Sequence, residues 1–432
     1  MRIVHLTAGT GAYYCGLCLR DNALANALRA LGHEVTLVPL YLPPVLEGGG
    51  DEEGDGWCPI FFGGINVYLQ QKISLFRHTP GWLDRLFNAR WLLRWSTRMS
   101  DMTRPDELGE LTVSMLRGRD GLQRKELNKL TTFLQGRGPF DVISIGTGLI
   151  IGIAPELARA LKAPVVVTLQ GEDGFLDSLP QPWRDQAWGL IGEQLRAAAA
   201  VVSASRYYGE MMARRLGLGA DALTVIPNGI DLTGYQDAGA APAVPTIGFL
   251  ARLCALKGLG LLVDAFIELR RRPEGARVRL RLAGSCTESD RVYVAAQEAK
   301  LAAAGLAGEF EVRANLSREE KLEFLRTLSV FSVPATYGEA FGLYIIEALA
   351  SGVPVVQPRL GAFPELVEST GGGLLCEPGD AASLADGLAT LLADPPRARA
   401  LGQQGRRAVV ERFSAAAMAG QFAGLCTRLK AG

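Results

Sequence analysis

The chain has 432 residues, and its 45 Lys and Arg balance its 45 Asp and Glu. This length suits two domains that each bury a core, and 48% hydrophobic with 21% charged residues is typical of a globular protein. The zero formal charge argues against a nucleic-acid-binding protein, and no apolar run reaches the 18 residues that suggest a membrane-spanning helix.

The chain begins with a pattern of strand, turn, helix and strand. Residues 3–6 are apolar, residues 8–12 form a glycine-rich turn, residues 22–31 have a helical pattern, and residues 33–38 have that of a second strand. The turn is only a partial dinucleotide fingerprint, because Tyr14 stands where the third glycine belongs and no acidic residue follows the second strand. This argues against an NAD-dependent oxidoreductase, although a glycine-rich turn still lets a ligand approach the backbone.

Cys15 and Cys18 lie at the start of this helix. A thiol at a helix N-terminus is often reactive, so a redox role is one interpretation. A zinc site would need a second pair of ligands, and Cys58 and His78 stand apart in the sequence. The other interpretation is that small side chains pack a tight loop. The seven cysteines show no disulfide-framework spacing, so we expect reduced thiols in a cytoplasmic protein.

Residues 42–140 form an insertion in the first predicted domain. It starts with prolines, glycines and an acidic stretch, which predict a flexible segment. Residues 82–95 combine Trp, Leu and Arg in a helical pattern, and residues 70–138 contain 13 Lys and Arg against 7 Asp and Glu. Such a helix can lie on anionic lipid or bind an anionic acceptor, or it can pack its Trp and Leu side chains inward. A peripheral membrane contact through about residues 77–98 is therefore one hypothesis.

The sheet pattern resumes after residue 140, and one apolar segment, residues 163–169, leads into Gln170, Glu172 and Asp173. Side chains at the carboxyl end of a strand lie where open α/β sheets bind ligands. The Gln170 amide can hydrogen-bond a hydroxyl but cannot take a proton. Glu172 and Asp173 can contact an acceptor hydroxyl, or they can stabilise the start of the following helix.

A second domain begins near Thr246 with an apolar strand that leads to Arg252. Lys257 and a glycine then open a helix that runs to about residue 269. Two cations next to a helix start suit a diphosphate, and surface charge is the weaker interpretation because Arg252 closely follows an apolar strand. Further apolar strands alternate with helical patterns, which predicts a doubly wound parallel sheet. These strands are predicted at residues 278–283, 310–313 and 330–334.

The most informative stretch, residues 337–350, reads YGEAFGLYIIEALA and places Glu339 and Glu347 eight positions apart. It follows one predicted strand and precedes another, so it forms a loop and a helix start where anionic ligands bind. Both glutamates could be ordinary charges near a helix start. However, Glu347 stands in a nearly all-apolar run, and a carboxylate there needs a partner. A ligand with phosphates and hydroxyls, such as a sugar nucleotide, suits this arrangement.

Four segments together resemble the retaining glycosyltransferases of family 4, which have the two-domain GT-B fold. The stretch with Glu339 and Glu347 is similar to the family's Glu-x7-Glu pattern. The resemblance covers most of residues 225–380 and is looser in the N-terminal half, where Gln170 replaces a His that is frequent in the family. The other similar segments follow in the expected order at residues 227–231 (PNGID), 248–258 (GFLARLCALKG) and 361–367 (GAFPELV).

The resemblance implies an α/β fold of two Rossmann-like domains with doubly wound parallel sheets that face a cleft. An N-terminal, acceptor-side domain is expected at residues 1–240. A nucleotide-sugar-binding domain is expected at residues 241–412, and a terminal helix that returns to the first domain at residues 413–432.

The resemblance also implies transfer of a sugar from a nucleoside diphosphate sugar to an unidentified acceptor hydroxyl, with retention of configuration and without a metal or other cofactor. Arg252 and Lys257 would hold the leaving diphosphate. Glu339 would bind hydroxyls of the transferred sugar, and Glu347 would bind the nucleotide ribose. Arg252, Lys257 and Glu339 are the expected catalytic residues. Further donor-binding residues are expected at Gly9, Gly11, Gln170, Ala340, Phe341, Gly342 and Leu343, and acceptor-side residues at Tyr13, Glu172 and Asp173.

Two other functions are compatible with parts of this pattern. A non-catalytic sugar-nucleotide-binding protein would share the fold, but the intact set of two cations and two glutamates argues against it. A nucleotide-dependent oxidoreductase fits less well, because the N-terminal glycine pattern is broken.

Overall fold

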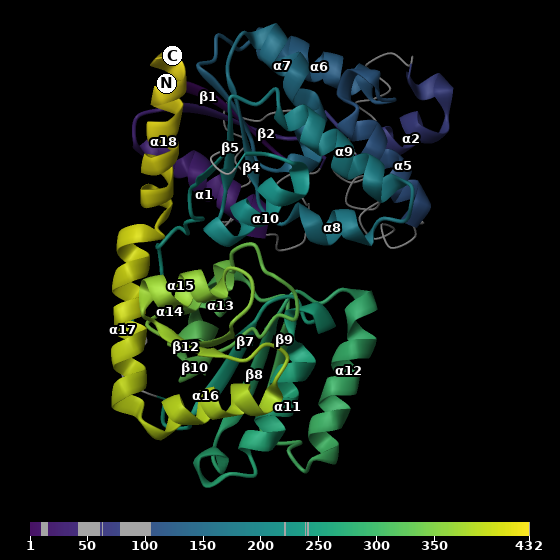
Figure 1. The fold of residues 1–432 in the computed structure, drawn as a ribbon. Coiled ribbons are helices and arrows are strands. Elements are labelled where there is room, and N and C mark those ends of the chain that lie inside the picture. The colour runs from purple at the N-terminus through teal and green to yellow at the C-terminus, as the bar shows by residue number, and fades with distance from the viewer. Residues whose placement is uncertain are drawn as a thin grey trace. The chain divides into compact units, whose positions relative to one another are not determined.

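The computed structural model describes residues 1–9, 16–41, 61–62, 64–77, 105–219, 222–237, 239 and 242–431. The chain forms two compact units, which Figure 1 shows as ribbons. Unit 1 comprises Met1–Pro227 together with Met418–Gly432, and unit 2 comprises Asn228–Ala417. The sequence-based boundaries after residues 240 and 412 differ from these limits, which fall after residues 227 and 417.

In its described part, unit 1 is built on a six-stranded sheet in the order β2-β1-β3-β4-β5-β6, with every pair of neighbours parallel. Strands β1 and β4 are almost wholly buried, as expected of parallel strands that helices cover on both faces. The strands are β1 (Arg2–Thr7), β2 (Glu34–Pro39), β3 (Val142–Ile145), β4 (Val165–Leu169), β5 (Ala200–Ser203) and β6 (Leu223–Val225).

Helices surround this sheet. The first helix begins at Gly16, earlier than the sequence pattern predicts, and therefore includes Cys18. The described helices of unit 1 are α1 (Gly16–Ala30), α2 (Gly64–Lys72), α5 (Pro105–Leu116), α6 (Arg124–Gln135), α7 (Ala154–Leu161), α8 (Glu172–Ser178), α9 (Trp183–Leu195), α10 (Arg206–Leu216) and α18 (Ala415–Ala431). Shorter 3₁₀ turns lie at η1 (Ser74–Arg77), η3 (Gly118–Asp120) and η4 (Gly148–Ile153).

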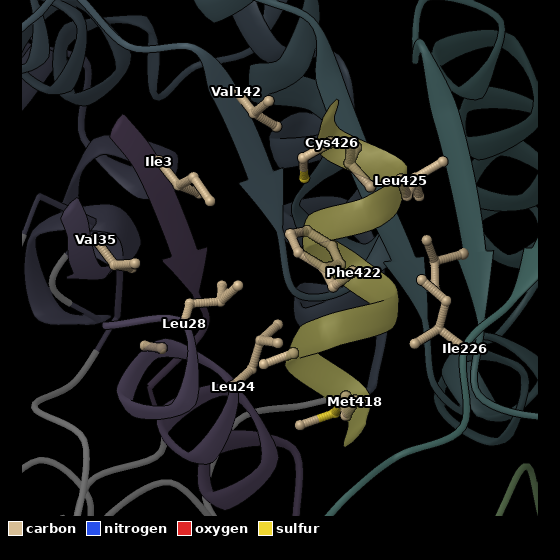
Figure 2. Packing of buried hydrophobic residues seen from close by; sticks show 14 residues of the cluster. Ile3, Leu24, Leu28, Val35, Val142, Ile226, Met418, Phe422, Leu425 and Cys426 are labelled. Carbon is tan, nitrogen blue, oxygen red and sulfur yellow. The ribbon is translucent and has the colours of Figure 1, made fainter. Parts of the chain in front are cut away.

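Helix α18 is the last element of the chain, and its buried face belongs to the core of unit 1. Figure 2 shows Phe422 in one apolar cluster with Ile3 from β1 and with Leu24 and Leu28 from α1. Residues from the two ends of the chain therefore share one core, which stabilises unit 1 by burying apolar surface. The buried residues of α18 recur at helical spacing and are Met418, Ala419, Phe422, Leu425 and Cys426.

Unit 2 has a second parallel sheet of six strands in its described residues, in the order β12-β11-β10-β7-β8-β9. The strand predicted at residues 330–334 is shorter than expected, because the Val333 amide donates to the Gln357 side chain rather than to a neighbouring strand. The strands are β7 (Thr246–Leu250), β8 (Arg279–Gly284), β9 (Phe310–Ala314), β10 (Val330–Phe331), β11 (Val355–Pro358) and β12 (Gly373–Cys376).

The helices of unit 2 alternate with these strands along the chain, as the sequence pattern predicts. They are α11 (Leu259–Leu269), α12 (Glu288–Ala303), α13 (Arg318–Arg326), α14 (Leu343–Ala350), α15 (Phe363–Thr370), α16 (Ala381–Ala393) and α17 (Pro395–Arg412), with 3₁₀ turns η5 (Ala255–Lys257) and η6 (Pro273–Gly275). The prediction of an α/β protein with two doubly wound parallel sheets is confirmed. None of the helices in the described ranges is long and apolar enough to cross a membrane.

The strand order places a topological switch point in each sheet. In unit 2, the chain runs outward from β7 to β8 and β9, and then returns to the opposite side of β7 to form β10. The connections after β7 and β10 therefore diverge, and the carboxyl edge of a sheet at such a switch point is where α/β proteins bind ligands. In unit 1, the same reversal occurs between β1 and β3.

Candidate functional site

The candidate site lies in unit 2 at the switch point between β7 and β10. Lys257 ends the 3₁₀ turn after β7, and Gly258 follows with a φ of +76°. A Cβ atom on Gly258 would lie 1.9 Å from the carbonyl oxygen of Pro334, so a side chain there would push the two connections apart. This close approach brings Lys257 next to the loop that carries Glu339.

Glu339 accepts hydrogen bonds from three donors through one oxygen. The Lys257 ammonium Nζ lies 2.5 Å from Glu339 Oε2. The hydroxyls of Tyr337 and Tyr344 donate to the same oxygen at 2.8 and 2.9 Å. Lys257 also donates to the Tyr337 hydroxyl and lies over the rings of both tyrosines. Among the described residues, Oε1 of Glu339 accepts no hydrogen bond, so this oxygen can serve a ligand.

Burial and the charge of Glu339 determine the protonation of this cluster and its access to solvent. Burial, together with the nearby charge of Glu339, raises the pKa of Tyr344 well above its usual value, so its hydroxyl stays protonated. The Lys257 and Glu339 side chains are 20% and 15% exposed. The pair is therefore shielded from most water but remains accessible to a ligand that competes for either partner.

A second loop fixes the backbone at Glu339. Gly361 has a φ of +62°, and a Cβ atom there would lie 2.5 Å from the Glu339 amide nitrogen. The Ala362 amide donates to the Glu339 carbonyl at 3.0 Å. Gly342, with a φ of +100°, precedes α14, and no side chain caps the start of that helix. The predicted donor residues Ala340 and Phe341 are buried in this loop, and Leu343 is the first residue of α14. An uncapped helix start favours a negatively charged group.

Arg252 follows β7 and is oriented by a carboxylate from a neighbouring connection. Its Nε donates to Asp290 at 3.2 Å to Oδ1 and 2.9 Å to Oδ2. Asp290 also accepts from Thr287, and the two residues form a capping box at the start of α12. Burial opposes ionisation of Asp290, but the Arg252 guanidinium and Thr287 hold the pKa of its carboxyl below the usual value. The Arg252 side chain is half exposed and can contact an anionic ligand.

Glu347 lies on α14 and is held separately from Glu339. Lys321 from α13 donates to Glu347 Oε1 at 2.7 Å, and the Tyr235 hydroxyl donates to the same oxygen at 2.8 Å. The expectation that Glu347 needs a partner is confirmed, although sequence reasoning named neither partner. One signal was available for Lys321, because it stands at helical spacing with the apolar Phe324 and Leu325.

In unit 1, Gly9 follows β1 with a φ of +73°, and Gln170 follows β4. The Gln170 side chain donates to the Gly146 carbonyl at 2.7 Å, which ties the connections after β3 and β4 together. Asp173 is half-buried on α8, and burial raises the pKa of its carboxyl. These residues lie at or near the carboxyl edge of the sheet.

The contacts of Glu172 favour a structural role over the predicted contact with an acceptor. The side chain is buried, with Oε1 accepting hydrogen bonds from Thr147 and from the Gly148 amide. Oε2 accepts from the Gln170 amide and from the Tyr208 hydroxyl. Both oxygens therefore join elements of unit 1, and neither is left to bind an acceptor.

Several predicted features lie outside the described residues, namely Gly11, Tyr13, Cys15 and nearly all of residues 77–98. Cys18 is buried in α1, which agrees with the packing interpretation for that residue. In the described ranges, no group of three or more His, Cys, Asp or Glu side chains could hold a metal ion.

The two-unit α/β fold and two family matches together identify the chain as a glycosyltransferase of the GT-B class. The family described as "Glycosyl transferase 4-like domain" matches residues 22–229, and the family described as "Glycosyl transferases group 1" matches residues 236–408. The chain belongs to the family 4 glycosyltransferases.

Curated relatives support this membership. The alpha-maltose-1-phosphate synthase of Mycolicibacterium smegmatis is 31% identical over 302 residues, which are 62% of this chain and 74% of that protein. The D-inositol 3-phosphate glycosyltransferase of Nocardia farcinica is 31% identical over 222 residues, 49% of this chain and 48% of that protein. The match thus spans about half the length of the second relative. The second name states glycosyl transfer, and the two names refer to different compounds.

Solved structures share the fold at low sequence identity. The sucrose-phosphate synthase of Thermosynechococcus elongatus has a TM-score of 0.70 at 19% identity, over 100% of this chain and 99% of that one. The Anabaena protein HepE in complex with UDP and glucose has a TM-score of 0.66 at 19% identity, over 99% of this chain and 100% of that one.

Proposed function

We propose that this protein is a retaining glycosyltransferase that moves a sugar from a nucleoside diphosphate sugar to an acceptor hydroxyl without a divalent metal. The observation that supports this most is the ion pair of Lys257 and Glu339 at the switch point of unit 2. Such a donor carries a diphosphate that suits the ammonium and sugar hydroxyls that suit the carboxylate. The complex of Anabaena HepE with UDP and glucose supports the same class of donor by analogy of fold.

The positively charged groups of the site would stabilise the leaving group. Breaking the bond between the sugar C1 and the diphosphate leaves negative charge on the diphosphate, and fixed charges and dipoles lower the barrier most when they face developing charge. We assign this role to Lys257, to Arg252 oriented by Asp290, and to the amides of the Gly342–Leu343 segment at the start of α14. These groups supply positive charge without a metal ion.

The two glutamates would bind the two ends of the donor. Glu339 would bind hydroxyls of the transferred sugar through Oε1, which its three donors leave available. Lys257 would contact the donor diphosphate. We assign Glu347 to the ribose of the nucleotide. From unit 1, Gly9 and Gln170 would contact the donor, and Asp173 would contact the acceptor. The acceptor then attacks on the side that the leaving group vacates, which retains the configuration at C1.

The test combines donor binding with donor hydrolysis on the purified full chain. Thermal shifts are measured with UDP-, GDP- and ADP-sugars in EDTA, with NAD as a comparison, and hydrolysis is followed by proton NMR. We expect one nucleotide class to stabilise the protein and its sugar to be released slowly, with the α-anomer appearing first from an α-linked donor. Initial release of the β-anomer would contradict retention, and activity that requires added metal would contradict metal independence.

The same experiment addresses the other candidate functions. Binding of a nucleotide sugar without hydrolysis, and without transfer to any of a panel of acceptors, would indicate a non-catalytic binding protein. Stabilisation by NAD alone would indicate an oxidoreductase.

A cytoplasmic location and a peripheral membrane contact through residues 77–98 stay predictions. Sedimentation of the protein with anionic vesicles, compared with neutral vesicles, would test the membrane contact.

A further inference from the structure

Helix α14 carries a single ionisable carboxylate on an otherwise apolar helix. Its sequence is LYIIEALA, and six of its eight residues are buried. Glu347 is only 13% exposed at its side chain, so its charge is largely removed from water. A carboxylate in such surroundings is stable only with a matched partner, because desolvation penalises the charged form.

The partner comes from the apolar face of another helix. Lys321 lies on α13 with Phe324 and Leu325, the other two buried residues of that helix, and its side chain is 4% exposed. A capping box of Ser317 and Glu320 defines where α13 starts, so the direction of Lys321 follows from the helix geometry. The Lys321 ammonium reaches Glu347 Oε1 at 2.7 Å.

Tyr235 adds a second donor to the same oxygen. Its side chain is buried, its hydroxyl lies 2.8 Å from Glu347 Oε1, and its carbonyl accepts a hydrogen bond from Arg406 on α17. Among the described residues, Glu347 Oε2 makes no polar contact, and it is not enclosed in the core either. The two donors thus fix the carboxylate through one oxygen and leave the other available.

A purely stabilising role would not require this arrangement. A buried ion pair is often no more stabilising than apolar side chains of the same volume, since the desolvation cost offsets the attraction. Lys321 also occupies a position where the helix pattern calls for an apolar side chain. A lysine at that position makes physical sense when the carboxylate itself must be present and correctly oriented.

We propose that Lys321 and Tyr235 are positioning residues for nucleotide binding, which hold Glu347 so that Oε2 accepts hydrogen bonds from the ribose hydroxyls of the donor. This inference rests on the proposed function, in which Glu347 binds the ribose. It adds that recognition of the ribose depends on two residues that do not contact it, Lys321 and Tyr235.

The test measures discrimination of the ribose hydroxyls by calorimetry on the full chain. The wild type is titrated with UDP, GDP and ADP, and the nucleotide that binds most tightly is compared with its 2′,3′-dideoxy counterpart. We expect the wild type to bind the ribose form roughly ten- to a hundredfold more tightly. In Lys321→Met this ratio should fall toward one, in Tyr235→Phe it should fall in part, and Lys321→Arg, which keeps the charge, should retain most of it.

Two variants separate this role from an effect on folding. Tyr235→Phe removes only a hydroxyl, so it carries the test if Lys321→Met does not unfold cooperatively. Lys300→Met removes a lysine that is 45% exposed on α12 and should keep the wild-type ratio. A loss of stability alone would lower the amount of active protein without changing the ratio.

The outcomes distinguish failure of this inference from failure of the proposed function. Wild-type protein that binds none of the three nucleotides would overturn the proposed function, and the inference with it. Nucleotide binding with a ratio of one in the wild type, or with the wild-type ratio in both Lys321→Met and Tyr235→Phe, would overturn the inference alone.

Discussion

The two units place charged residues at the switch points of similar sheets, but they expose them differently. In unit 2, Lys257, Glu339 and Arg252 all retain contact with solvent. In unit 1, Asp21 packs on the turn after β3, beside the switch point, and Asp21, Arg20 and His5 are at most 1% exposed. A similar topology can therefore present charge to a ligand or enclose it in the core, and burial decides which of the two occurs.

The enclosed cluster of unit 1 has a defined geometry. His5 from β1 lies 2.8 Å from the Ser144 hydroxyl on β3 and 3.4 Å from Asp21 Oδ1, and Arg20 donates to the same Asp21 oxygen at 3.0 Å. A Cβ atom on Gly146 would lie 2.3 Å from Asp21 Oδ2, so the turn after β3 packs directly on the carboxylate. A serine, a histidine and an aspartate are thus joined here, but burial keeps substrates away from them, in contrast to a hydrolase triad.

The largest predicted effect concerns this cluster. Asp21→Asn should lower the free energy of unfolding of unit 1 by about 3 to 5 kcal/mol, because it removes the buried carboxylate that pairs with the Arg20 guanidinium. Urea unfolding of the full chain measures this loss. Asp185→Asn, at a surface pair with Arg184, should change stability by less than about 1 kcal/mol. If Asp21→Asn and Asp185→Asn lowered the free energy of unfolding equally, burial would not explain the difference between an enclosed and a surface ion pair.

The pH dependence of the stability difference between wild type and Asp21→Asn tests whether the enclosed carboxyl is ionised. Burial tends to raise the pKa of Asp21, but His5, Arg20 and Thr7 together hold it below its ordinary value of 3.8. Ionised Asp21 therefore contributes stability that is fully present above pH 3.8 and is lost as the pH falls below that value. The difference in urea stability between wild type and Asp21→Asn should be constant from pH 5 to about 3.8 and should narrow as the pH falls further toward the acid limit of folding. A difference that stays constant with pH would contradict the assigned ionisation.

Substitutions in the partly accessible cluster of unit 2 should change the turnover rate rather than the stability. Glu339→Gln should reduce donor turnover about 10²- to 10³-fold. A neutral amide cannot balance the charge of Lys257 or the positive charge that develops on the sugar ring as the bond to the diphosphate breaks. Steady-state hydrolysis or transfer with the identified donor measures this loss. Glu368→Gln on α15, which is 61% exposed, serves as the matched control. Turnover of Glu339→Gln within a few-fold of the control would remove Glu339 from the catalytic set.

Glu347 should affect affinity more than rate. Glu347→Gln should weaken nucleotide binding roughly ten- to a hundredfold while turnover at saturating donor changes only about threefold. The amide is preferred to alanine, because truncation would leave Lys321 buried with no acceptor on α14. Calorimetry and the separate determination of kcat and KM test this split. An equal fall in kcat and in kcat/KM would instead place Glu347 among the catalytic residues.

The smallest predicted effect belongs to the tyrosines around Glu339. Tyr344→Phe removes one of three donors to Oε2 and should lower turnover about three- to tenfold. Tyr293→Phe is the matched control, because its hydroxyl contacts the Gly260 amide and not Glu339. If the two variants behave alike in donor hydrolysis, Tyr344 has no specific part in orienting the carboxylate.

Much of the fold could be predicted from local patterns. Strands β4 (VVVTL) and β7 (TIGFL) are mostly apolar and buried throughout, as expected of parallel strands that are covered on both faces, and helices with glycine stops lie between the strands. Boundaries were less predictable where a single contact decides them, as at Val333, whose amide bonds to a side chain. The register of the sheets depends on partners distant in the chain and needed the structure.

The candidate site likewise contains residues that the sequence identified and residues that only the structure revealed. Sequence spacing identified Arg252, Lys257, Glu339 and Glu347, because charged residues that follow apolar strands or stand in an apolar run are unusual. It did not identify Asp290, which is 38 residues from Arg252, or Tyr235, which is 112 residues from Glu347. Nothing local in the sequence couples such pairs. For Glu172, the sequence left two roles open, and only its buried hydrogen bonds favoured the structural one.

The sequence by itself therefore determined which elements form and which charged groups stand at the edges of the strands. These properties follow from periodicity, from glycine positions and from the cost of placing charge among apolar residues. Only the tertiary structure decided which of those charges are enclosed, as at Asp21, and which remain accessible, as at Lys257. It also decided that Lys321 meets Glu347, because the packing of α13 and α14, rather than the chain between them, sets that distance.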